Sequence, residues 1–220
     1  IDWGYESEPD AKMNGRTLPL PRGKLLGGCS SVNRMIYMRG HSGDYVGWRQ
    51  MGAAGWSYAD VLPYFRRMES SWRGAGAYHG GDGPLTVSPV ENEHLMGAPI
   101  RESVLAAGFA ESADLSGEQQ EGFSRCEVTV DKRGRRASTS QAYLEPARTR
   151  RNLHVETQAQ TTRILFEKDR AVGIEYRQNG ALHQVRARKE VILSAGAYGS
   201  PQVLMLSGIG PQEHLASHGI

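Results

Sequence analysis

The chain has 220 residues, of which 39% are hydrophobic and 23% charged, and its formal net charge is +2. These values are ordinary for a globular protein, so they exclude a disordered chain, and the charge is too small to indicate a nucleic-acid partner. Cys29 and Cys126 are too few for a disulfide framework, and no apolar run approaches the about 18 residues of a transmembrane segment, so the sequence predicts a cytoplasmic protein.

The first eighty residues contain an irregular stretch followed by helical signals. Prolines interrupt residues 1–21, which we expect to be irregular. A helix is expected over residues 30–38, directly after a double glycine, and a short second helix is expected with Asp44 as its cap. Ser57 and Asp60 have the spacing of a capping box and predict the start of a third helix.

The middle of the chain changes character. Glycines at 80–83 predict a turn, and apolar residues alternate with polar ones over 85–87, as in a half-buried strand. The pattern then predicts a helix over 92–107, a strand running into a turn over 125–134, and a short helix over 138–147.

The last third contains strand signals and one more helix. Alternating or apolar runs predict strands at 152–157 and 162–167, and Asn179-Gly180 is a strong hairpin signal. The apolar run at 190–197 ends in small residues, and Ser200 is placed to cap a helix that follows. A wholly apolar strand, a small-residue turn and a helix are typical of a buried parallel strand in an α/β sheet.

These elements predict three parts. Residues 1–80 and 141–220 form the two halves of an α/β nucleotide-binding domain, and residues 81–140 form a smaller segment inserted between them. Neither an internal repeat nor a low-complexity tract suggests another organisation.

A glycine-rich stretch at Gly27–Ser31 precedes the expected helix of residues 30–38. Glycines let a ligand approach the backbone, and the amides of Cys29, Ser30 and Ser31 would point from the helix N-terminus towards an anion such as a pyrophosphate. The alternative is a tight turn with a serine cap. The sequence contains neither the Gly-x-Gly-x-x-Gly fingerprint nor a Lys-Ser/Thr pair after the glycines.

Three other motifs are better explained without a metal-binding, catalytic or regulatory role. His214 and His218 are four residues apart without a third ligand nearby, which favours surface residues over a zinc site. The sequence GHSGD at 40–44 departs from the nucleophile elbow of serine hydrolases in its last residue and in its position after a helix. The run RRAS, ending at Ser138, matches a kinase target of a kind that is common by chance.

Two longer stretches carry a specific resemblance. RGKLLGGCSSVNRMIYMRGHSGDYVGW, residues 22–48, resembles the first signature of the glucose–methanol–choline (GMC) flavoprotein oxidoreductases, and GAYGSPQVLMLSGIG, residues 196–210, resembles the second. The stretches GWSYADVLPYF, YHGGDGPLTV, GRRAS, AYLEPA and NLHVETQAQTTRI lie between them in the order that the family shows. The resemblance covers essentially the whole chain and is greatest for the bacterial choline dehydrogenase-like branch.

The resemblance implies an FAD-binding sheet of the Rossmann-like, glutathione-reductase type, with part of an inserted α+β substrate domain. By similarity, the glycine-rich stretch lies along the FAD pyrophosphate and flavin, and Asn33 makes a hydrogen bond near the flavin. Thr161 lies at the position whose backbone holds adenine in family members, although that residue is usually valine. The cofactor-binding residues implied are Trp3, Arg22, Lys24, Leu26, Gly27, Gly28, Cys29, Ser30, Asn33, Thr161, Ala195 and Gly196.

The implied activity is oxidation of the CH–OH group of a primary alcohol, choline-like, aliphatic or aromatic, with hydride transfer to flavin N5. The family's fingerprint lies before the equivalent of Ile1 and its catalytic histidine after that of Ile220, so we expect an internal fragment that is inactive by itself and contains no catalytic residue. Val32 stands where some members bond the flavin through a histidine, which predicts non-covalent FAD.

The resemblance specifies no electron acceptor, and peripheral attachment to the inner face of the membrane is an alternative to a free cytoplasmic location. The alternative function is a non-catalytic α/β fragment that holds no cofactor.

Overall fold

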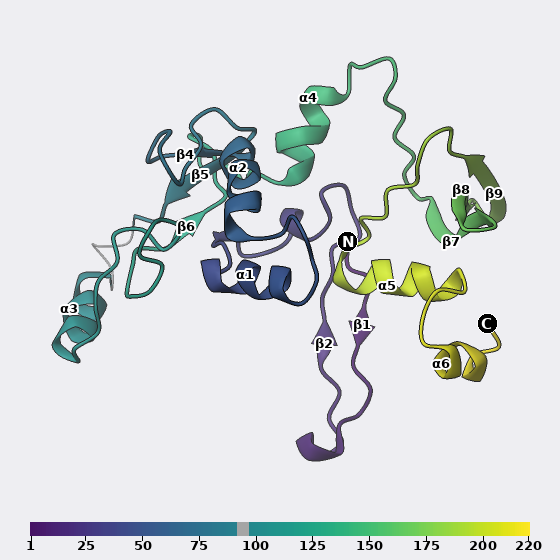
Figure 1. The fold of residues 1–220 in the computed structure, drawn as a ribbon, viewed down its shortest axis with the longest axis horizontal. Helices are drawn as coiled ribbons and strands as arrows, with labels where there is room; N and C mark the ends of the chain where they lie inside the picture. The colour runs from purple at the N-terminus through teal and green to yellow at the C-terminus, as the bar shows by residue number, and fades with distance from the viewer. Residues whose placement is uncertain (92–96) are drawn as a thin grey trace. The chain divides into compact units, whose positions relative to one another are not determined.

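The computed structural model describes residues 1–91 and 97–220, and Figure 1 shows the order of the elements along the chain. The chain divides into two compact units, Ile1–Arg150 and Arg151–Ile220, which are described separately below. The three parts expected from the sequence were assigned by the domain to which each segment belongs. The two units do not test that assignment, which stays a prediction. None of the helices in the described part of the chain is long and apolar enough to cross a membrane.

The first unit begins with a narrow ribbon. Strand β1 (Tyr5–Glu6) pairs antiparallel with β2 (Pro19–Leu20), and the short 3-10 helix η1 (Ala11–Met13) lies between them. Two-residue strands agree with a segment that prolines interrupt, since proline lacks a backbone donor.

The expected helix over residues 30–38 does not form. Instead a 3-10 helix of one turn, η2 (Gly28–Ser31), leads to strand β3 (Ile36–Tyr37). The Asn33 side chain accepts a hydrogen bond from the amide of Met35 at 2.9 Å, and Met35 has a φ of 64°. Asparagine offers the backbone a local bond that competes with helix continuation, and a left-handed residue ends any right-handed helix.

Two helices follow with well-defined caps. Helix α1 (Ser42–Gln50) confirms the predicted short helix, but its N-cap residue is His41, whose Nδ1 accepts from the Gly43 amide at 3.1 Å, and not Asp44. Asp44 instead stands in the first turn, where its carboxylate accepts from the His41 amide at 2.9 Å. Helix α2 (Tyr58–Met68) begins with the predicted capping box of Ser57.

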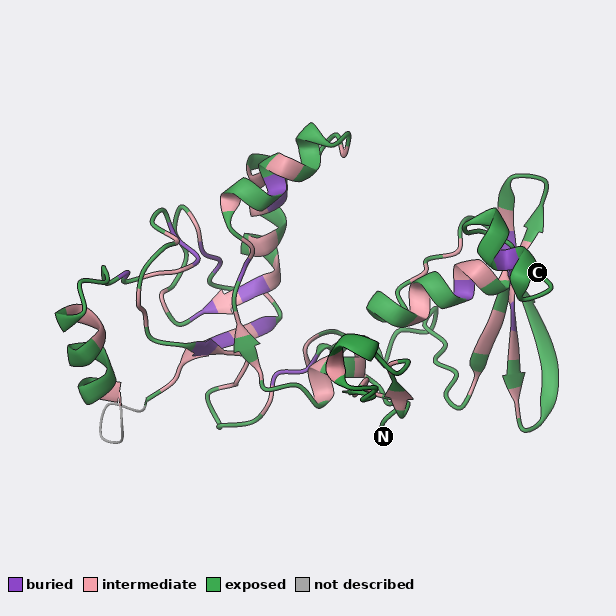
Figure 2. Cartoon of the chain, turned by 90° about the horizontal axis from the view of Figure 1, so that it is seen from below, coloured by how far each residue is buried: buried purple, intermediate pink, exposed green. Residues whose placement is uncertain are grey.

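Strand β3, which precedes α1, and three strands that follow α2 form a four-stranded sheet in the order β3-β6-β5-β4. Strand β4 (Glu69–Ser71) is parallel to β5 (Leu85–Pro89), and β6 (Glu127–Val128) is antiparallel to both β5 and β3. The predicted strand at 85–87 is confirmed. In Figure 2, buried residues gather on these strands, and Val87 is only 1% exposed.

The rest of the first unit is helical or irregular. Helix α3 (Ala98–Ala106) confirms the described part of the helix expected over 92–107, of which residues 92–96 lie outside the described residues. For the strand running into a turn expected over 125–134, the turn is confirmed by the bond from the Gly134 amide to the Asp131 carbonyl, but the strand is limited to β6. The helix expected at 138–147 is confirmed as η4 (Ser140–Leu144, a π-helix) and α4 (Glu145–Ala147).

The second unit is a three-stranded antiparallel sheet with two helices. Strands β7 (Gln160–Glu167), β8 (Arg170–Gln178) and β9 (Ala181–Arg186) lie in that order. Asn179 and Gly180 have φ values of 49° and 80°, as a two-residue hairpin turn requires, so the predicted hairpin is confirmed. Helix α5 (Gly196–Leu206) packs against β7, and α6 (Gln212–Ser217) follows it.

Two expected strands are absent, at 152–157 and at 190–195. A parallel strand needs neighbours that satisfy its backbone groups, and no described segment pairs with residues 190–195. Ile192 is 78% exposed as a result. Ser200 is not the N-cap residue of α5, because that residue is Ala195. Ser200 lies inside the helix, and its hydroxyl accepts from the Ala195 amide at 3.0 Å.

Candidate functional site

The first residues of the chain lie against the segment that leads into the glycine-rich stretch. The Trp3 amide donates to the Arg22 carbonyl at 3.0 Å, and the Lys24 amide donates to the Ile1 carbonyl at 2.8 Å. The Lys24 ammonium lies 4.4 Å from the centre of the Trp3 ring, a cation–π contact. Three predicted site residues, Trp3, Arg22 and Lys24, are thereby brought together, and two of them carry positive charge.

The glycine-rich stretch folds back closely on itself. A Cβ atom on Gly23 would lie 2.5 Å from the carbonyl oxygen of Gly28, so only glycine fits at that position. Gly27 and Gly28 have φ values of 85° and 52°, in the left-handed region that glycine adopts without strain. Leu26 is exposed, and its carbonyl accepts from the Ser31 hydroxyl at 2.8 Å.

Not all of the backbone amides that were predicted to face an anion are available to do so. The Ser30 amide donates to the Gly27 carbonyl at 3.2 Å, so it does not point outwards as predicted. The amides of Gly27 and Cys29 donate to no acceptor in residues 1–91 and 97–220. Because η2 has only one turn, its dipole adds little, and these two backbone donors are what the stretch offers an anion.

A distant segment, residues 136–140, clamps the stretch. The Ser30 hydroxyl donates to the Gly27 carbonyl at 2.6 Å and accepts from the Thr139 amide at 2.9 Å, across 109 positions of sequence. A Cβ on Gly27 would lie 3.2 Å from Ser140 Cβ, which shows how closely the segments approach. No residue of this clamp was predicted as a site residue, although the family stretch GRRAS lies partly within it.

Asn33 is exposed, and its carboxamide has a fixed orientation. Its Oδ1 accepts from the Met35 amide and from the Arg136 guanidinium, each at 2.9 Å. Two donors face the same atom, which must therefore be the oxygen. The Nδ2 group donates to no described residue, so Asn33 presents a hydrogen-bond donor to any bound group.

The remaining predicted site residues lie in the second unit. Thr161, on β7, lines a hollow of about 300 Å³ whose wall is mostly apolar and includes Ile164 and Val203. Ala195 and Gly196 stand at the start of α5, where Gly196 has a φ of 82°. The structure thus gathers the first nine predicted residues in one unit and the last three in the other.

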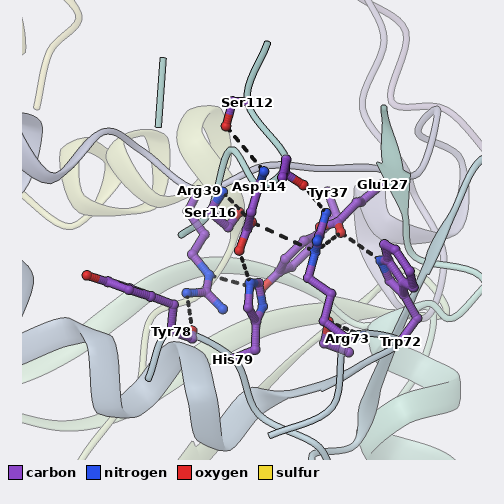
Figure 3. A network of polar contacts seen from close by, with 12 residues as sticks. Tyr37, Arg39, Trp72, Arg73, Tyr78, His79, Ser112, Asp114, Ser116 and Glu127 are labelled. Atoms are coloured by element: carbon purple, nitrogen blue, oxygen red, sulfur yellow. Dashed lines mark hydrogen bonds and ion pairs between the residues drawn. The ribbon is translucent and has the colours of Figure 1, made fainter. Parts of the chain in front are cut away.

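The first unit also contains a buried charged cluster that the sequence does not predict (Figure 3). Glu69 is fully buried, and its carboxylate lies 2.7 Å from Arg39 Nη2, 2.8 Å from His79 Nδ1 and 2.7 Å from the Tyr37 hydroxyl. The other ring nitrogen of His79 lies 2.7 Å from Asp114. The cluster ties β4 to β3 and to the loop that carries Asp114, and no pattern within any one segment indicates it.

The cluster perturbs its own titration. Burial by itself raises the pKa of Glu69, but the hydrogen bonds from His79, Tyr37 and Arg39 outweigh burial and lower the pKa to about 2. The hydrogen bond to Glu69 raises the pKa of His79, with a further contribution from Asp114. Burial also raises the pKa of the Tyr37 hydroxyl. The charges of the cluster neutralise one another, so we assign it a structural role.

The structure also bears on the minor motifs. Within the described ranges, no group of three or more His, Cys, Asp and Glu side chains could hold a metal ion. Ser138 is 8% exposed and its hydroxyl accepts from the Gln141 amide at 3.3 Å, which does not suit a kinase target. Ser42 begins helix α1 and follows no strand turn of the elbow type.

Comparison with protein families gives a match to the GMC oxidoreductase model over residues 10–219. The chain belongs to the GMC oxidoreductase family. Among curated relatives of this GMC chain, human mitochondrial choline dehydrogenase and the oxygen-dependent choline dehydrogenase of Brucella ovis are each 47% identical over 219 residues. These alignments cover 100% of the chain but only 37% and 40% of the relatives, so it spans about two fifths of their length. Since human and bacterial relatives are equally similar, a bacterial origin is not established.

Solved structures agree with the family assignment. Pyridoxine 4-oxidase from Mesorbium loti matches with a TM-score of 0.92 and 31% identity, over 100% of this chain and 43% of that one. An FAD-dependent oxidoreductase from Chaetomium thermophilum matches with a TM-score of 0.92 and 28% identity, over 100% of this chain and 40% of that one. The predicted fold class, that of the GMC FAD-binding fold, is confirmed.

Proposed function

We propose that the whole protein is an FAD-dependent oxidoreductase that oxidises the CH–OH group of a small primary alcohol, with choline-like alcohols as the leading class. The observation that carries the proposal is the clamped glycine-rich stretch, residues 23–33 (the glycine loop hereafter). The names of the relatives support the substrate class. Residues 1–80 and 141–220 are proposed to serve the cofactor and residues 81–140 the substrate.

The glycine loop fits an anionic dinucleotide on three counts. The amides of Gly27 and Cys29 have no acceptor among the described residues, and no side chain projects from Gly27 or Gly28. Lys24, within the loop, places a positive charge on the ring of Trp3. Backbone donors without side chains, next to a cation, are the usual means by which proteins bind phosphate groups.

Bound FAD would supply the acceptor for the hydride that leaves the alcohol carbon. The residues of this chain have binding and orienting roles: the glycine loop holds phosphate, and Asn33 donates a hydrogen bond to an acceptor atom of the cofactor. Thr161, Ala195 and Gly196 are proposed to contact the ADP half. The base that takes the alcohol proton is proposed to lie outside these 220 residues, which would make the chain inactive by itself.

We propose further that FAD is held without a covalent bond. Val32 precedes Asn33, is 43% exposed, and has no nucleophilic atom that could attack the flavin. Affinity must then come from many contacts of the kind that the glycine loop offers. Acid precipitation tests this point, because non-covalent FAD leaves a white pellet and a yellow supernatant, whereas a yellow pellet with a flavin-sized mass adduct on a peptide contradicts it.

The function is tested with the protein expressed from its complete gene. Purified material should be yellow with flavin absorbance and should oxidise choline or simple primary alcohols when an artificial electron acceptor is present. The 220-residue chain with added FAD should show no turnover. Colourless protein that binds no added FAD and oxidises no alcohol would favour the alternative, a non-catalytic fragment without cofactor.

A further inference from the structure

Arg136 reaches the glycine loop from a distant hairpin. Its Nη1 group lies 2.9 Å from Asn33 Oδ1 and 3.2 Å from the Ser30 carbonyl oxygen, across 103 and 106 positions of sequence. One guanidinium therefore contacts both the helical turn of the loop and the asparagine that follows it. No other described side chain donates to Asn33.

The backbone that carries Arg136 is firmly anchored. Val130 and Arg136 form an antiparallel bridge, and the turn between them is held by the carboxylate of Asp131, which accepts from the Arg135 amide at 2.9 Å. The next residue, Ala137, is 7% exposed and its amide donates to the Thr129 carbonyl at 2.9 Å. A side chain extending from a fixed backbone places its guanidinium with little loss of further freedom.

The contact decides which way Asn33 faces. With the Met35 amide and Arg136 both donating to Oδ1, the plane of the carboxamide is fixed and Nδ2 is turned to the opposite side. Without Arg136, one donor remains, and the carboxamide is able to rotate and to exchange its donor and acceptor ends. A bound atom that accepts a hydrogen bond then loses its fixed partner.

Arg136 also keeps an uncompensated charge. Its neighbour Arg135 pairs with Asp131 at 2.8 Å, whereas no carboxylate in the described ranges lies within ion-pair distance of Arg136. A structural arginine is commonly neutralised by a carboxylate, and this one instead faces a carbonyl and a carboxamide beside the glycine loop.

We propose that Arg136 is a positioning residue of the cofactor site, which orients the Asn33 carboxamide so that its NH₂ group donates to an acceptor atom of the bound flavin. The inference rests on the proposed function. It adds a residue from the 136–140 segment to a site otherwise built from residues 1–33 of this unit.

The test uses the complete protein and three variants: Arg136→Met, Asn33→Ala and the double variant. Arg136→Met should weaken FAD binding about tenfold, the size expected for one charge-assisted hydrogen bond. It should also move the visible absorption band of bound flavin towards that of Asn33→Ala. The double variant should bind FAD no more weakly than Asn33→Ala by itself, because the two residues act as one unit.

Arg135→Met is the matched control, since Arg135 is adjacent and exposed, and its bonds to described residues all lie within its own turn. It should leave the FAD Kd and the spectrum unchanged. If Arg136→Met does not yield folded protein, Arg136→Gln makes the same comparison, because it also removes the charge and shortens the side chain while keeping a polar end. A wild-type protein without FAD would overturn the proposed function. Wild-type binding with an unaltered Arg136 variant, or additive losses in the double variant, would overturn the positioning role.

Discussion

Substitution of Glu69 by glutamine should destabilise the first unit severely. Glu69 is fully buried and is the partner of Arg39, whose side chain is 1% exposed. Glutamine has nearly the same shape, so the change removes the negative charge and leaves the packing. Among the residues that the structure describes, Arg39 then keeps only neutral partners, the Tyr78 carbonyl at 2.7 Å and the Tyr37 hydroxyl at 3.5 Å. A buried cation is left without an anion.

Breaking a buried ion pair from one side costs about 3–5 kcal/mol. Each 1.4 kcal/mol is a factor of ten in an equilibrium constant, so the open form of the unit should become about two to three and a half orders of magnitude more populated. Amides that exchange only when this region opens should exchange faster by the same factor. The Ser71 and Trp72 amides are suitable, because they bond to Gly80 and Val87 across the buried sheet.

Hydrogen exchange followed by mass spectrometry on the complete protein measures this directly. Glu111→Gln is the matched control, since Glu111 makes an ion pair with Arg101 at 2.6 Å on the surface, where 40% of the Glu111 side chain is exposed. Exposed pairs contribute little, so exchange in that variant should stay close to the wild-type rate. Equal rates in the Glu69 and Glu111 variants would refute the argument that the buried charge is required.

Three further outcomes are expected. Because the pKa of His79 is raised above its ordinary 6.5, its contribution to the free energy of unfolding is present below pH 6.5 and is lost as pH rises through the folded-state pKa. Denaturant melts at a series of pH values should therefore show an unfolding free energy that falls over this range, and His79→Gln should remove the fall. The same fall in the variant would contradict this. Gly28→Ala and Gly15→Ala place alanine at φ values of 52° and 72° in open space, so both should cost about 1 kcal/mol, but only the former should raise the FAD Kd. Ser207→Ala removes the bond that the Ile164 amide donates at 2.8 Å, and should lower the unfolding free energy by about 1 kcal/mol in urea titrations.

Local patterns predicted local structure well. The capping box of Ser57 and the Asn179-Gly180 turn were both found, because each depends on bonds within a few residues. The helix expected over 30–38 failed for a local reason as well: Asn33 and Met35 form a competing turn that apolar periodicity does not reveal.

Contacts between distant segments could not be predicted in the same way. The buried cluster joins Glu69 to Arg39, His79 and Asp114, and the clamp joins Ser30 to Thr139; nothing within any one of these segments specifies its partner. The resemblance to the GMC family named cofactor residues on the glycine loop, but it assigned no role to the residues that hold the loop in place. In the apolar run at 190–195 the local pattern is that of a strand, but no described strand lies beside it to complete the pairing.

The clamp on the glycine loop has a consequence for biosynthesis. Ribosomes add about 5–20 residues per second, so Thr139 is joined to the chain roughly 5–20 s after Ser30, which lies 109 positions earlier. During that interval the nascent polypeptide contains the loop without the hydroxyl and amide partners that close it. The loop therefore takes the form described here only after Thr139 has been added, when most of the first unit has been synthesised.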